Sequence, residues 1–181
     1  MRKLFILCAF LLQLLSPVYP QQATTATIEP NLKYGKPSKE ALSLTSYAPD
    51  TTATAIYLFH QGQSDFIYHD GFQLTTEHWV RIKILKPQGV SYADVSVPYY
   101  SPTDRDEGKE RASDIEGCSY NIENGKCIKT PMKRESISFE RINNLYKMLK
   151  FSLPAVKEGT VIEYHYKLYS DYFSHIDNWM M

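Results

Sequence analysis

The chain has 181 residues, and its 20 Lys and Arg residues balance its 20 Asp and Glu residues. A neutral chain lacks the basic face that nucleic-acid binding demands, and it lacks a polybasic attraction to membrane surfaces. The length allows one domain with a sizeable core, and the 14 Tyr residues favour half-buried strands. The composition therefore indicates a β-rich globular protein that does not bind nucleic acid.

Residues 1–22 have the pattern of a secretory signal peptide. Arg2 and Lys3 precede an apolar run from Leu4 to Leu15. This run is shorter than the ~20 residues that span a bilayer, and no second apolar stretch follows it. We therefore expect export to the periplasm or the cell envelope, with no transmembrane segment in the mature chain.

The rest of the chain divides into a short linker and one domain. Residues 23–37 are rich in Thr, Ala and Gln and have no apolar periodicity, which is typical of a linker. Ser38 is placed to cap a short helix that begins the domain, residues 38–181. We expect this domain to be truncated at its C-terminal end.

Most of the domain alternates apolar and polar residues, as strands do. Turn signals stand at Gly62, Asp70-Gly71, Asn124-Gly125 and Gly159. A charged stretch, residues 101–114, is expected to be a mobile loop. The strands predicted between these signals cover residues 53–60, 64–69, 72–85, 92–97, 137–142, 145–153 and 160–169. Many short strands joined by turns predict an all-β, mostly antiparallel β-sandwich.

The long predicted strand 72–85 has one apolar face and one polar face. Its even positions are mainly apolar, whereas its odd positions carry charges such as Arg81 and Lys83. The polar face is therefore expected to contact solvent. Glu163, on the polar side of the last predicted strand, is expected to be a solvated charge for the same reason.

Two cysteines, Cys118 and Cys127, flank the Asn124-Gly125 turn. With that turn, Cys127 faces Ile122, and the two cysteines lie ~13 Å apart along the ladder. A disulfide requires Cα atoms within ~7 Å. The hairpin therefore predicts two free, mostly buried thiols, and without a nearby histidine neither is expected to be catalytic.

The sequence does not predict a metal or cofactor site. His60, His69 and His78 are evenly spaced, but turns at Gly62 and Asp70-Gly71 would set them opposite other residues and apart from one another. His78 falls on the apolar face and is expected to be a core histidine. No catalytic, metal or cofactor residue is therefore assigned.

Three aromatic residues are the candidate ligand contacts: Trp79, Tyr99 and Tyr100. Trp79 lies on the polar face of its strand, where it serves as a binding platform or is covered by a second sheet or a neighbouring domain. We favour the covered position. The tyrosine pair, beside Pro98, is either an exposed loop contact or a packed corner.

From residue 37 onward, the chain resembles a domain of unknown function that precedes transglutaminase-like domains in exported bacterial proteins. The resemblance lies in the segments Tyr47-Ala48-Pro49-Asp50, Ile82-Lys83-Ile84-Leu85-Lys86 and Tyr92-Ala93-Asp94-Val95, and above all in residues 151–164, FSLPAVKEGTVIEY. It implies an N-terminal β-sandwich, with the catalytic Cys, His and Asp in a downstream transglutaminase-like domain.

The resulting expectation is a non-catalytic accessory or interaction domain of an exported transglutaminase-like protein. The downstream domain is the expected partner. The alternative is an independent module that binds a glycan or a peptide, and a small cysteine hydrolase is the least favoured hypothesis.

Overall fold

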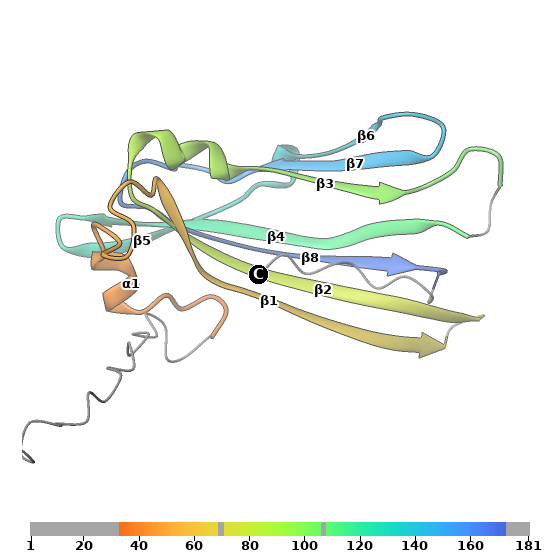
Figure 1. Cartoon of the computed structure of the whole chain (residues 1–181), viewed down its shortest axis with the longest axis horizontal. Helices are drawn as coiled ribbons and strands as arrows, with labels where there is room; N and C mark the ends of the chain where they lie inside the picture. The colour runs from red at the N-terminus through yellow and green to blue at the C-terminus, as the bar shows by residue number, and fades with distance from the viewer. Residues whose placement is uncertain (1–32, 69–70, 106–107, 173–181) are drawn as a thin grey trace, which may run out of the picture.

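The computed structural model describes residues 33–68, 71–105 and 108–172, which form two packed antiparallel sheets (Figure 1). The predicted all-β sandwich is confirmed. The predicted signal peptide, residues 1–22, lies outside the described residues, as does most of the predicted linker. Within the described ranges, no helix has the length and apolar character needed to cross a membrane.

Five strands form the larger sheet, in the order β1-β2-β8-β4-β5, and three form the smaller sheet, in the order β3-β7-β6. The larger sheet contains β1 (Ala55–Tyr68), β2 (Phe72–Ile84), β4 (Glu110–Glu123), β5 (Lys126–Pro131) and β8 (Val161–Ser170). The smaller sheet contains β3 (Asp94–Tyr100), β6 (Ile137–Arg141) and β7 (Tyr146–Ser152). The remaining elements are α1 (Lys39–Ser43) and two short 3-10 helices, Pro87–Ala93 and Arg134–Ser136. Because β8 inserts between β2 and β4, the last described strand joins two hairpins that are distant in sequence.

The core lies between the two sheets. The even positions of β2, including Val80, Ile82 and Ile84, pack with Leu149 and Phe151 of the smaller sheet. This is the apolar face that the alternation predicts, and burial of such side chains is the main stabilising term. His78, on the same face, is buried and stacks on Tyr166 at 4.6 Å, as a core histidine does.

Local signals predicted several elements correctly. The Ser38 side chain accepts a hydrogen bond from the Ala41 N–H and caps α1. Asn124 and Gly125 both have positive φ, 51° and 73°, as the tight hairpin turn requires. Cys127 pairs with Ile122 as predicted, and both thiols are free. Cys127 is nevertheless exposed, so the prediction that it is buried was wrong, because β5 is the edge strand of its sheet.

The predicted turn at Gly62 was wrong. β1 runs through Gly62 without a break and pairs with β2 almost along its whole length, so His60 faces Val80. A glycine is tolerated in an edge strand when a complete ladder supports it. Tyr68 pairs with Phe72, so three residues close this hairpin instead of the predicted two. The rings of His60 and His78 lie 5.9 Å apart, so the prediction that these two histidines are separated was wrong; His69 lies outside the described residues.

Two strand boundaries also differ from the prediction. β3 continues through Pro98 to Tyr100, because β3 is an edge strand and proline can lie where no ladder partner needs its N–H. β4 begins at Glu110, within the segment expected to be a loop, because it pairs there with β8.

The outer face of the larger sheet is not uniformly solvated. Residues 33–54, here called the N-terminal strap, cross this face at one end (Figure 1). Arg81, Lys83 and Glu163 lie beneath the strap and are at most 1% exposed. The prediction that these charges face solvent was therefore wrong.

Candidate binding groove

Half of β4 has a strand neighbour on only one side. Its residues from Glu110 onward pair with β8, whereas β5 pairs only with Cys118–Glu123. The Met132 N–H donates to the Gly117 carbonyl at 2.8 Å, and the chain then turns toward the smaller sheet. Within the described ranges, no strand pairs with the other edge of Glu110–Gly117.

A β-bulge shapes this part of β4. The register with β8 shifts between Ser113 and Glu116, and Asp114 has a φ of 51°. The extra residue keeps both Ala112 and Ile115 packed against the core, while Glu116 pairs opposite His165 on the outer side. Bulges of this kind bend a strand and redirect its side chains. Here the bulge places the apolar side chain of Ile115 on the core side of the strand and the carboxylate of Glu116 on its outer side.

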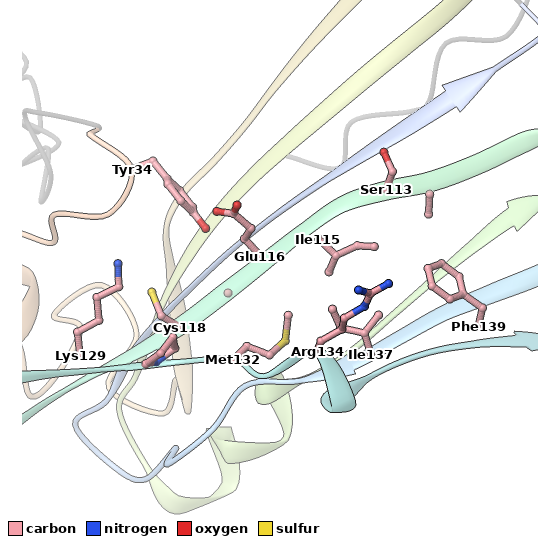
Figure 2. A pocket seen from close by; sticks show the side chains of 13 residues that line it. Tyr34, Ser113, Ile115, Glu116, Cys118, Lys129, Met132, Arg134, Ile137 and Phe139 are labelled. Atoms are coloured by element: carbon pink, nitrogen blue, oxygen red, sulfur yellow. The ribbon is translucent and has the colours of Figure 1, made fainter.

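A groove of about 660 Å³ runs along this edge, between β4 and β6 (Figure 2). We call it the β4/β6 groove. Its apolar side chains include Ile115 of one sheet and Ile137 and Phe139 of the other, and Arg134 lies among them (Figure 2). It is lined by Tyr34, Ala112, Ser113, Ile115, Glu116, Gly117, Cys118, Lys129, Pro131, Met132, Arg134, Ile137 and Phe139. An apolar pocket with a few convergent polar groups is a typical binding site.

The groove continues toward the start of β4 as a second hollow of about 410 Å³. The two share Ala112 and follow consecutive stretches of β4 and β6. The second hollow is lined by Tyr99, Ser101, Lys109, Glu110, Arg111, Ala112, Arg141 and Lys147. Together they form a cleft along the unpaired edge of β4.

The cleft is basic, although the chain is neutral. Six Lys or Arg side chains line it: Lys109, Arg111, Lys129, Arg134, Arg141 and Lys147. Its acidic residues are Glu110 and Glu116, and the Glu110 carboxylate already accepts a hydrogen bond from the Tyr100 N–H at 2.7 Å. Lining charges of one sign attract ligands of the other sign.

A buried polar network supports the wall of the groove. Arg81 and Glu163 form an ion pair at 2.6 Å, with both side chains fully buried. Glu163 also accepts from the Tyr120 hydroxyl at 3.0 Å and from the Gly35 N–H at 2.9 Å. Because Gly35 follows Tyr34 in the chain, this network holds Tyr34 at the groove. Burial raises the pKa of Tyr34, so its hydroxyl stays protonated near neutrality.

Cys118 lines the groove but lacks the surroundings of a catalytic thiol. Burial raises its pKa, which keeps it in the weakly nucleophilic thiol form. Among the described residues, no cluster of three or more His, Cys, Asp or Glu side chains could hold a metal ion.

Of the three aromatic candidates, Trp79 lies on the larger sheet, and Tyr99 and Tyr100 lie on the smaller sheet. Trp79 is half-buried on the outer face of the larger sheet and stacks on His165 at 5.1 Å. The smaller sheet does not cover it. It lines a small hollow of about 250 Å³ with Tyr34, Phe59, Gln61 and Gln63. Tyr34 lines both this hollow and the groove.

Tyr99 and Tyr100 belong to the smaller sheet. Tyr99 is 6% exposed and packs in the core, so only a small part of its side chain lines the cleft. Tyr100 is half-buried and makes edge contacts with Tyr146 and Tyr172, each at 5.6 Å. The pair therefore forms a packed corner.

Sequence reasoning missed the β4/β6 groove, since no motif marks the place where β5 stops pairing.

The buried His78 is expected to make the stability of the fold sensitive to acid. Burial, with a smaller contribution from the nearby His60 and His165, lowers its pKa from 6.5 to about 4. The unfolded chain therefore takes up a proton below pH 6.5 that the folded chain accepts only near pH 4, so this contribution to stability is lost as the pH falls through that window. We expect the urea concentration at the unfolding midpoint to decrease as the pH is lowered from 6.5 to 4. The decrease is expected to be smaller in His78→Leu. The difference between the two proteins at pH 8 gives the packing loss alone, and an equal acid response in both would contradict the assignment.

No protein-family model matches the chain, and no curated protein matches it. One solved structure resembles part of it, a crystal structure described as a "putative protease" from Parabacteroides distasonis. The sequence identity is 10% and the TM-score is 0.46, over 65% of this chain and 23% of that one. The chain therefore corresponds to less than a quarter of the length of that protein.

Proposed function

We propose that the chain is a non-catalytic interaction domain that contacts another polypeptide through the β4/β6 groove. The observation that carries this proposal is a groove of about 660 Å³ beside a strand edge without a partner among the described residues. Exposed apolar side chains such as Phe139 line it, and apolar grooves with polar rims are typical of protein contacts.

The proposal extends to the protein that contains the domain. The signal pattern in residues 1–22 supports export to the periplasm or cell envelope. The sequence resemblance supports an accessory role beside a downstream transglutaminase-like domain. This role predicts a reading frame that continues beyond codon 181 into a domain with the Cys, His and Asp of that chemistry. A stop codon there would contradict the accessory role and leave the interaction domain acting alone.

A second candidate function is glycan binding at Trp79. Its hollow combines an indole ring with the amides of Gln61 and Gln63, and an aromatic platform beside polar groups suits a sugar ring. The hollow is smaller than the β4/β6 groove, about 250 Å³ against about 660 Å³, so polypeptide binding is favoured.

Selection on the purified chain distinguishes the two functions. A random peptide library displayed on phage is expected to yield binders, whereas a glycan array is expected to yield none. Phe139→Glu places a charge in the groove and is expected to weaken the selected peptides about tenfold or more. Phe66→Glu is the matched control, because Phe66 is similarly exposed, 63% against 52%, but lies outside the groove.

The outcomes separate clearly. Peptides that bind Phe139→Glu and the unchanged chain equally would overturn the groove as the site. Glycan binding that is abolished by Trp79→Ala, without peptide binders, would establish the second candidate function in its place.

A further inference from the structure

The open edge of β4 has the geometry of a strand position. The stretch Glu110–Glu116, with which no described strand pairs on this side, continues the line on which β5 pairs with the second half of β4. The Gly117 carbonyl, which accepts from the Met132 N–H, marks where that pairing ends. A strand edge with unpaired N–H and C=O groups is a template for another extended chain.

The far wall of the cleft is also a strand edge. β6 is the outer strand of the smaller sheet, and Ile137 and Phe139 of β6 line the groove across from β4. The eight residues of Glu110–Gly117 include one bulge residue and lie opposite the seven residues 164–170 of β8, so a peptide of seven extended residues, ~23 Å, matches this stretch. A peptide in this position would close the open side of the sandwich.

The side chains define the chemistry of such a peptide. In an added strand, alternate residues face the core side, where Ala112 and Ile115 lie, and the residues between them face the outer side. Arg111 and Lys129 line the cleft near its two ends, and Arg134 and Arg141 line it from the side of the smaller sheet. Apolar residues therefore suit the positions beside Ala112 and Ile115, and acidic residues suit the positions beside the basic side chains.

We propose that the cleft binds an acidic peptide segment in extended conformation, added as a strand to the open edge of β4. The inference rests on the proposed polypeptide-binding function and specifies the mode and charge of the partner. Main-chain hydrogen bonds to β4 supply affinity, and the basic rim selects acidic sequences, as in other cases of strand addition. Glu116 opposes this charge preference, but it is outnumbered by the basic side chains around it.

Fluorescence anisotropy with three labelled octapeptides tests the proposal. The first alternates Val and Glu, the second alternates Val and Lys, and the third is the first with N-methyl groups on all of its backbone nitrogens. The acidic peptide is expected to bind about tenfold or more tightly than either of the others. Backbone methylation removes donors and blocks pairing while keeping the side chains, so it isolates strand addition.

Two charge-matched variants locate the site. Arg111→Glu combined with Lys147→Glu reverses two charges of the cleft and is expected to weaken the acidic peptide about tenfold or more. Lys126→Glu combined with Lys157→Glu changes the net charge equally at exposed positions outside the cleft, and affinity is expected to stay within about twofold. Circular dichroism is the control measurement that checks whether both variants fold.

Each result supports or overturns the proposal. Equal binding of the methylated peptide would exclude strand addition, and equal binding of the Lys peptide would exclude the acidic preference. If phage selection yields peptides that Phe139→Glu blocks but these octapeptides do not bind, the inference fails while the polypeptide-binding function stands. If selection also yields nothing, both fail.

Discussion

Glu163→Ala is expected to lower the free energy of unfolding by about 3–5 kcal/mol. Glu163 is fully buried and pairs with the equally buried Arg81 at 2.6 Å. Removing the carboxylate leaves the guanidinium buried without its counter-charge. The substitution also removes the acceptor to which the Tyr120 hydroxyl and the Gly35 N–H donate. Urea denaturation measures the loss. The N-terminal strap is expected to loosen with it, because Glu163 accepts from the Gly35 N–H and its partner Arg81 donates to the Lys33 carbonyl at 2.7 Å.

An exposed ion pair of equal length provides the control. Lys150 and Glu140 lie 2.6 Å apart, but their side chains are 45% and 54% exposed. Glu140→Ala is therefore expected to cost less than about 1 kcal/mol, since solvent and salt screen such pairs. Replacing both buried partners, as in Arg81→Met with Glu163→Leu, is expected to cost much less than Glu163→Ala alone. Similar losses for Glu163→Ala and Glu140→Ala would contradict the role of the buried pair.

Leu149→Ala is expected to destabilise the fold by about 2–5 kcal/mol. Leu149 is 0% exposed and lies in the core between the two sheets. Its truncation removes apolar contacts and leaves a cavity that strands held in a ladder cannot easily fill. The free energy of unfolding, from urea titration at neutral pH, measures the effect.

Leu145→Ala makes the same chemical change four residues away. Leu145 is 47% exposed, so its truncation is expected to cost less than about 1 kcal/mol. A small loss at Leu149, or an equal loss at both positions, would mean that the packing between the sheets is not the main stabilising contact.

Short-range patterns predicted much of the fold. The alternation in β2 identified the core face correctly, including His78, because successive residues of a strand point to opposite sides. The Asn124-Gly125 turn set the register that pairs Cys127 with Ile122, since positive φ at both positions defines the hairpin. Gly62 misled the same reasoning, because the ladder with β2 outweighs the local preference of one glycine.

The candidate site could not be predicted in this way. The sequence pattern singles out Trp79, Tyr99 and Tyr100 as aromatic residues on polar or loop segments, and the structure places Tyr99 in the core. The β4/β6 groove depends on where β5 ends and on which strand lies across from it. Both are contacts between residues distant along the chain, and no local pattern contains them.

The sequence by itself determined the β class, the apolar face of each long strand, the capped helix and the central hairpin, because each depends on residues close together in the chain. Only the tertiary structure decided which polar face is covered and which strand edge stays open. Arg81 and Glu163 belong to polar positions of alternating strands, and they are buried because the N-terminal strap crosses them. The edge of β4 is open because β8 inserts beside β2 and β5 pairs with only half of its neighbour.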